Sequence, residues 1–397
     1  MATYLKNIRI INGKNDSVIE NGHVVIKGEY IDKVSRNPIK FQEGKVINCT
    51  GKTLLPGLID THVHLSGDAS PSVLDKFKDT DSVVTLRAAS NAKKTLESGF
   101  TMVRNLGEKS YIDVHLSNSI EEKESLGPRI ITCGRGISIL GGHGTPAIRR
   151  VSGADDARLA VREHVNAGVD QIKIIASGGI LTQGSPVGAS QMTEKELYAI
   201  SDEAKAHFKP ICAHAHGNES IKNCIDIGVA SIEHCSLGDE DTFEKMAEYD
   251  IYMVPTFSSG EMIIKHGKQL GIDKEIIEKT KKIEEEKYEK FRCALKKKVK
   301  VAMGTDASTP YNNHGNNAQE LNLMVEAGMS PIEAIIATTY NAAKLCGMEG
   351  NTGVIEEGKY ADLLITESNP LKEINSLQDK KNIFMLFKEG DCVISKE

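Results

Sequence analysis

The sequence predicts an α/β protein: a (β/α)8 barrel with a small β-sandwich domain built from both ends of the chain. Short apolar segments alternate with helical segments through the middle, and short strands punctuated by Gly and Asn occur near both ends. The 397 residues suffice for one large and one smaller domain. We expect residues 1–55 and 352–397 to form the sandwich and residues 56–351 to form the barrel.

Near the chain ends, apolar and polar residues alternate as they do in strands with one buried face. The runs are YLKNIRIING, GHVVIKGEYIDKV and KVINC near one end, and TGVIEEGKYADLLITE and NIFMLFKEGDCVIS near the other. We expect the first three runs to form a small antiparallel sheet and the last two to join the same domain.

The middle of the chain contains eight short apolar segments that read as strands. They are GLIDTHVHL (57–65), FTMVRNLG (100–107), RIITCG (129–134), QIKIIAS (171–177), PICAHAHG (210–217), ASIEHCS (230–236), YMVPTFS (252–258) and KVAMGTD (300–306). Helical segments lie between most of them, and this repeated β-then-α unit predicts a closed barrel. In such barrels the chemistry lies at the C-terminal ends of the strands.

Four of these segments end in residues that can bind a metal: His62 and His64, His214 and His216, His234, and Asp306. Residues i and i+2 of a strand face the same side, so His62 and His64 can point at one spot. An isolated pair of this kind is as easily explained by packing. Histidines and an aspartate on four strand ends are not, because burying such groups unpaired is costly. Imidazole with carboxylate suits Zn²⁺ and similar ions.

Lys173 lies inside the apolar run of the fourth segment. A buried ammonium tends to lose its proton, and the neutral amine can then add CO2 to give a carbamate that bridges two metal ions. A snorkelling or salt-bridged lysine is the alternative. The histidines at the neighbouring strand ends favour the carbamate.

These motifs resemble those of the amidohydrolase superfamily, in its binuclear branch with a carboxylated lysine. The resemblance covers nearly the whole chain and lies in LLPGLIDTHVHL, MGTDAS and GVIEEGKYADLLI. GRGIS with GGHG (134–144), IKIIASGG and AHAHG resemble most the group that contains Xaa-Pro dipeptidases and imidazolonepropionases. The lysine favours the dipeptidase side, because imidazolonepropionase-type enzymes usually carry a histidine there and bind one metal.

The resemblance implies two divalent metal ions, which we expect to be Zn²⁺. His62, His64 and Asp306 would hold the more buried ion, and His214 and His234 would hold the second. Carboxylated Lys173, an N6-carboxylysine, would bridge the two ions. Asp306 would also act as the catalytic proton carrier.

Two further histidines are implied to face the substrate. His143 in GGHG would act in catalysis by reaching the scissile carbonyl or the substrate carboxylate. His216 would contact the substrate, although some relatives carry tyrosine at that position.

The expected activity is metal-dependent hydrolysis of an amide bond in a dipeptide or an N-acyl amino acid. One alternative is a non-peptide amide, carbamate or cyclic amide substrate, the last as in imidazolonepropionase. Another is a non-catalytic scaffold of the same fold, which predicts broken ligands, whereas all six positions here are intact. Metal storage is disfavoured by the aspartate after the eighth strand.

Composition limits the partners. A net charge of −6 gives no basic face for nucleic acid or anionic lipid, and no apolar run reaches the length of a membrane span. The first residues lack a secretory signal, so we expect a cytoplasmic enzyme with a small-molecule substrate, and a homo-oligomer is compatible with this. The charged segment 273–300 predicts a long surface helix, with a lid as the alternative.

Overall fold

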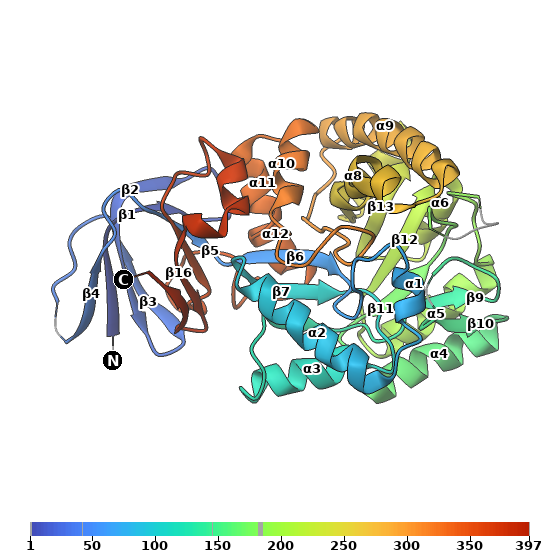
Figure 1. Ribbon diagram of the computed structural model, residues 1–397, viewed down its shortest axis with the longest axis horizontal. Coiled ribbons are helices and arrows are strands. Elements are labelled where there is room, and N and C mark those ends of the chain that lie inside the picture. The colour runs from blue at the N-terminus through green and yellow to red at the C-terminus, as the bar shows by residue number, and fades with distance from the viewer. Residues whose placement is uncertain (1, 42, 145, 182–185, 397) are drawn as a thin grey trace. The chain divides into compact units, whose positions relative to one another are not determined.

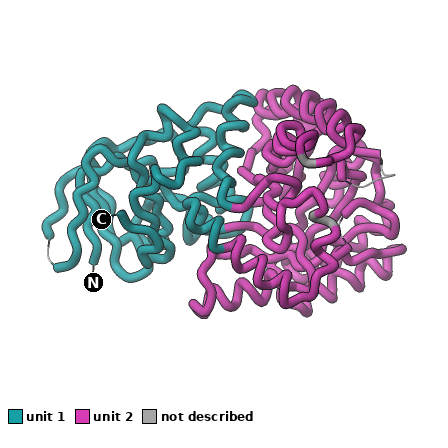
Figure 2. Tube along the Cα trace, in the orientation of Figure 1, with its two compact units in different colours: residues 1–60, 93–102, 315–397 teal, residues 61–92, 103–314 magenta. Residues whose placement is uncertain are grey.

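The structure is a computed structural model that describes residues 2–41, 43–144, 146–181 and 186–396 (Figure 1). The chain divides into two compact units (Figure 2). Unit 1 comprises residues 1–60, 93–102 and 315–397, and unit 2 comprises residues 61–92 and 103–314. Both ends of the chain therefore belong to unit 1.

Unit 1 contains one eight-stranded sheet. Its strands are β1 (Ala2–Ile11), β2 (Val18–Lys27), β3 (Tyr30–Ser35), β4 (Gly44–Asn48), β5 (Thr53–Pro56), β15 (Leu363–Thr366), β16 (Ile383–Lys388) and β17 (Asp391–Ser395). The order is β17-β16-β15-β5-β1-β2-β3, with β4 also paired to β1. The expectation of an antiparallel sheet is wrong for β4, which pairs with β1 in parallel, and β5, which was not predicted, also pairs with β1 in parallel. The reason is that the chain crosses over after β3 and returns on the other side of β1.

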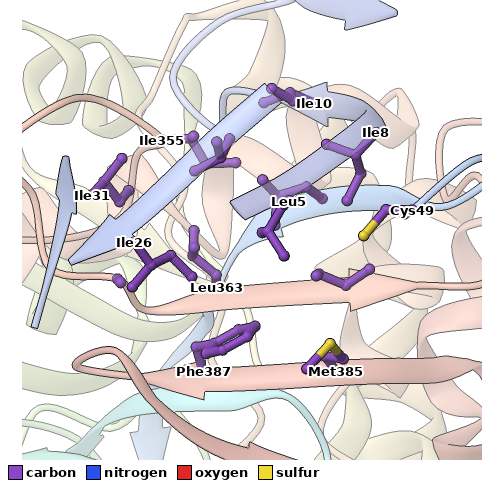
Figure 3. Packing of buried hydrophobic residues seen from close by; sticks show 14 of the residues in the cluster. Leu5, Ile8, Ile10, Ile26, Ile31, Cys49, Ile355, Leu363, Met385 and Phe387 are labelled. Atoms are coloured by element: carbon purple, nitrogen blue, oxygen red, sulfur yellow. The ribbon is translucent and has the colours of Figure 1, made fainter. Parts of the chain in front are cut away.

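The core of unit 1 joins strands from both ends of the sequence. Side chains of β1, β2 and β3 gather with those of β15 and β16 in one apolar cluster (Figure 3). Leu5, Leu54 and Leu363 have no exposed surface. The helices of unit 1 are α10 (Gln319–Glu326), α11 (Pro331–Ala337) and α12 (Tyr340–Leu345), with short 3-10 turns at Ile374–Gln378 and Lys380–Asn382.

Unit 2 is built on parallel strands. They are β8 (Arg129–Ile131), β9 (Ile137–Ile139), β10 (Arg149–Val151), β11 (Ile172–Ile175), β12 (Ile211–Gly217), β13 (Ser231–Leu237) and β14 (Tyr252–Val254), and β6 (Leu58–Val63) and β7 (Phe100–Asn105) run into it from unit 1. One sheet has the order β10-β9-β11-β12-β13-β14 and the other β6-β7-β8. Seven of the eight predicted strands of the middle are thus observed.

The eighth predicted segment, 300–306, forms isolated bridges in place of a regular strand. Val301 bridges Met253 of β14, and Ala307 bridges Val63 of β6, both in parallel. The Asp306 amide donates to His62 O at 2.7 Å, and the His64 amide donates to Ala307 O at 3.0 Å. This segment therefore places Asp306 directly beside His62, near the end of β6, and His64, which follows that strand.

The helices of unit 2 lie around these strands (Figure 1). They are α1 (Val73–Lys76), α2 (Asp81–Leu96, which ends in unit 1), α3 (Ile112–Glu121), α4 (Ala154–Ala167), α5 (Glu194–Ala206), α6 (Asn218–Asp226), α7 (Glu240–Glu248), α8 (Phe257–His266) and α9 (Lys274–Lys296), with a 3-10 turn at Gly267–Leu270. The long charged helix predicted from the sequence is α9, which packs against α8 and β13. Among the residues placed by the structure, no helix is both long and apolar enough to span a bilayer.

Replacing Leu363 by Ala should lower the free energy of unfolding by about 2–5 kcal/mol, because the cavity opens in the middle of the unit 1 core. Val46 on β4 is 38% exposed, and its replacement by Ala is the matched control, with a much smaller expected loss. Denaturant unfolding of both variants measures the difference. Equal losses would contradict the assignment of Leu363 to this core.

Candidate metal centre

Two groups of potential metal ligands lie on the wall of one cavity in unit 2. The first is His62, His64 and Asp306, and the second is His214, His216 and His234. Within each group the ligand atoms lie within 4.8 Å of one another. Lys173 and His143 line the same cavity, so the structure brings together all eight residues singled out in the sequence.

The first group converges on one carboxylate oxygen. Asp306 Oδ1 lies 3.4 Å from His62 Nε2 and 3.2 Å from His64 Nε2. The other ring nitrogen of each histidine faces an acceptor: Glu233 Oε2 lies 2.9 Å from His62 Nδ1, and Gly107 O lies 3.3 Å from His64 Nδ1. A carboxylate and a carbonyl only accept, so both Nδ1 atoms donate. Both Nε2 atoms are therefore turned toward Asp306.

Two histidines of the second group also have a side-chain partner at Nδ1. His234 Nδ1 lies 2.7 Å from Thr256 Oγ1, and His216 Nδ1 lies 2.9 Å from Ser236 Oγ. The rings of His216 and His234 stack at 4.7 Å, and the His214 ring lies 4.6 Å from that of His234. Partners of this kind, held on the far nitrogen, fix the orientation of metal-binding histidines in proteins.

Backbone strain helps to build the site. His234 has a φ of 68°, Asp306 of 56° and Thr256 of 52°, in the left-handed region that non-glycine residues seldom adopt. Two consecutive strand residues normally face opposite sides. Glu233 nevertheless contacts His62, and the His234 ring also lies 5.3 Å from that of His62. The left-handed backbone at His234 thus allows both Glu233 and His234 to face His62. Strain of this sort is typical of functional sites.

Burial keeps these imidazoles neutral. Desolvation lowers the pKa of His62 to about 4 and that of His216 to about 3, with the charges of Lys173 and Lys287, respectively, as the next causes. The pKa values of His214 and His234 lie well below the ordinary range for the same first reason. Burial alone would raise the pKa of Asp306, but His62 and His64 lower it overall. Neutral imidazole and ionised carboxylate are the forms that bind metal.

Two observations show that the site fits a divalent cation. A neutral His62 that donates from Nδ1 turns an unprotonated Nε2 toward the Asp306 carboxylate, so two acceptors face each other at 3.4 Å. His214 Nε2 is buried and has no hydrogen-bond partner among the described residues. A cation between Nε2 of His62 and the Asp306 carboxylate removes the repulsion between them, and a cation bound to His214 Nε2 offsets the cost of burying that atom.

Lys173 lies on β11 with only 2% of its surface exposed. It forms no salt bridge within the described ranges, and its charge contributes to the lowered pKa values of His62, His214 and His234. Its buried amine therefore lies close enough to interact electrostatically with histidines of both ligand groups.

His143 stacks on His214, with ring centres 4.6 Å apart. Its backbone amide donates to Gln191 Oε1 at 2.9 Å. Gly179 leaves room for the ring, since a Cβ there would lie 2.5 Å from His143 Nε2. Burial lowers the pKa of His143 to about 4.

Sequence reasoning missed the buried ion pair beneath the first group. Arg104 donates to Glu233 Oε1 at 2.7 Å and to Thr61 O at 2.6 Å, and both side chains of the pair are at most 1% exposed. Burial would raise the pKa of Glu233, but Arg104 and then His62 bring it well below the usual range. An arginine inside an apolar strand was the available signal for Arg104. For Glu233 there was no such signal, because strand alternation places it on the face opposite His234.

Comparisons with known proteins give one family. A family model described as "Amidohydrolase family" matches residues 53–393. An ochratoxinase of Aspergillus niger is 30% identical over 371 residues, covering 85% of this chain and 75% of that protein. A solved structure described as a Xaa-Pro dipeptidase with bound methionine in the active site aligns with a TM-score of 0.90 and 32% identity over 99% of each chain. An imidazolonepropionase of Thermoplasma volcanium is 23% identical, covering 95% and 92%.

Replacing Arg104 by Met should leave the Glu233 carboxylate buried without its cation and destabilise the protein by about 3–5 kcal/mol. Because Glu233 also orients His62, metal affinity should fall roughly 10- to 100-fold. Chemical denaturation measures the first effect, and titration with Zn²⁺ measures the second.

Arg162→Met is the matched control, since Arg162 pairs with Glu203 and its side chain is 58% exposed. Its expected loss is below about 1 kcal/mol, with unchanged metal affinity. If Arg104→Met binds Zn²⁺ as tightly as this control, the orienting role of the ion pair is wrong.

Proposed function

The chain belongs to the amidohydrolase family and is a metal-dependent hydrolase of carbon–nitrogen bonds, and from that premise we propose that it hydrolyses dipeptides or N-acyl amino acids. The observation that carries the proposal is the pair of ligand groups on one cavity wall, with His143 beside them. The similarity to a Xaa-Pro dipeptidase supports a dipeptide as the substrate, and the similarity to an ochratoxinase supports hydrolysis of an amide bond.

We propose that His62, His64 and Asp306 hold one divalent metal ion and that His214 and His234 hold a second. Lys173 joins the two groups as a carbamate: its neutral amine adds CO2 and releases one proton. Its burial on the wall of the cavity that both ligand groups line supports this assignment. Zn²⁺ suits this set of nitrogen and oxygen donors.

The remaining chemistry belongs to residues of this chain. When bound, the metal ions supply a water of lowered pKa and polarise the amide carbonyl. Asp306 accepts the proton of the attacking water and returns it to the leaving nitrogen, first as base and then as acid. The neutral imidazole of His143 donates an N–H to the oxygen that becomes negative in the transition state. His216, beside His214, contacts the substrate.

We further propose that residues 56–351 close into a (β/α)8 barrel and that residues 1–55 and 352–397 form a sandwich. The bridges of Val301 to β14 and of Ala307 to β6 support closure, because they link the last parallel strand of one sheet to the first of the other. The shared core of strands from both chain ends supports the sandwich.

The direct experiment incubates the Zn-reconstituted protein with a panel of dipeptides, including Xaa-Pro, and of N-acetyl amino acids. Mass spectrometry measures the amino acid released. We expect release from a defined subset. No release from any member, by protein with bound metal, would contradict the proposed substrate class and direct the search to carbamates, cyclic amides and anilides.

Replacing Lys173 by Ala should remove the bridge, reduce bound metal to one ion per chain or fewer, and lower kcat by at least about 100-fold. Elemental analysis of the protein and the assay above measure the two effects. Gly350→Ala is a neutral control, because a Cβ at Gly350 meets no atom within 4 Å. Two ions per chain with full turnover in Lys173→Ala would refute the carbamate bridge.

A further inference from the structure

A buried ion pair on α9 faces the cavity that holds the ligand groups. Lys287 Nζ lies 3.1 and 3.3 Å from the two carboxylate oxygens of Glu284, and it donates to Thr256 O at 3.0 Å. The side chains of Lys287 and Glu284 are only 2% and 7% exposed. Both residues line the cavity together with His143 and His216. A buried ammonium is unusual, and neither the ligand groups nor the proton carrier accounts for this one.

Positive charge gathers at the His143 and His216 end of this cavity. Lys287 lines the cavity together with both histidines. The Arg150 guanidinium donates to four backbone carbonyls, those of Ile139, Gly142, His143 and Gly144, and forms no salt bridge among the residues that the structure describes.

Two carboxylates line the same cavity as these cations, Asp306 and Glu284. Glu284 is the carboxylate beside Lys287, and burial raises the pKa of Glu284. A second anion near Lys287 therefore favours the neutral form of Glu284. Apolar side chains also line this cavity, among them Leu106, Ile148 and Ile263. A ligand that suits this lining has an apolar body and one negative group.

We propose that Lys287 binds the carboxylate of the substrate, which makes this enzyme selective for amides that carry a free carboxylate next to the scissile bond. The proposal rests on the proposed function. Glu284 and Thr256 O hold the ammonium in place before substrate arrives, so little side-chain freedom is lost on binding. A charge-assisted hydrogen bond in a dry site is strong enough to decide between an acid and its neutral amide.

A different role for Lys287 must be separated from this one. Lys287 donates to the backbone oxygen of Thr256, whose hydroxyl contacts His234 Nδ1. Loss of Lys287 would then disturb His234 and slow every substrate equally. Carboxylate binding instead affects acids and spares neutral amides.

The test compares N-acetyl-L-phenylalanine and N-acetyl-L-leucine with their C-terminal carboxamides, on Zn-reconstituted protein, by mass spectrometry of the released amino acid or amino acid amide. We expect wild-type kcat/KM to favour the acids roughly 10- to 100-fold. In Lys287→Met the preference should fall below about threefold, and Lys287→Arg should restore part of it. Glu284→Gln should increase the preference, because it removes the competing anion.

Lys282→Met is the matched control, an exposed lysine of the same helix that should keep the wild-type preference. A wild-type enzyme that hydrolyses acid and amide equally well overturns the inference, as does an equal loss on both substrates in Lys287→Met.

Failure of the proposed function is recognised separately. If no compound is hydrolysed, calorimetric titration with N-acetyl-L-phenylalanine and its carboxamide still tests Lys287. Tighter binding of the acid, lost in Lys287→Met, upholds the subsite without the activity. Equal affinity, or no binding of the acid, overturns it.

Discussion

The site depends on one electrostatic constraint: nitrogen and oxygen acceptors face each other where solvent is excluded. Burial holds His62 neutral, its Nδ1 donates a hydrogen bond to Glu233, and its Nε2 faces the Asp306 carboxylate. This arrangement is unfavourable by itself and becomes favourable around a cation. The same reasoning applies to the buried Nε2 of His214, which has no hydrogen-bond partner among the residues that the structure describes. Much of the surrounding structure serves to keep these atoms in place.

The orienting partners come from distant parts of the chain. Arg104 on β7 fixes Glu233 on β13, and Glu233 fixes His62 at the end of β6. On the other side, Lys287 of α9 donates to Thr256, whose hydroxyl contacts His234. Left-handed backbone at His234, Thr256 and Asp306 brings these groups to one cavity. Packing must maintain this strain, because each such residue costs about 1–3 kcal/mol.

Much of this architecture could be predicted from the sequence. The alternation of apolar strands and amphipathic helices gave seven of the eight middle strands, and the rule that chemistry collects at strand ends identified His62, His214 and Asp306. These signals are local, with a period of 2 or 3.6 residues. The parallel pairing of β1 with β4 and β5 was not predicted, because a crossover depends on which edge of a strand stays unpaired.

The supporting residues were harder to predict for a physical reason. Period-2 alternation assigns Glu233 to the face opposite His234, and only the positive φ at His234 brings both to the site. Lys287 lies in a helix whose charge pattern reads as solvated, yet its side chain is 2% exposed. Burial of a single charged residue depends on tertiary packing, which a charge pattern does not encode.

Anomalous X-ray diffraction at the zinc edge, from crystals of the Zn-reconstituted enzyme grown with bicarbonate, is the most direct test of the binuclear metal centre. We expect two zinc peaks per chain. One lies among His62, His64 and Asp306, the other lies beside His214 and His234, and electron density for a carboxylate on Lys173 lies between them. A single peak, or an unmodified Lys173 beside two peaks, would contradict the binuclear centre.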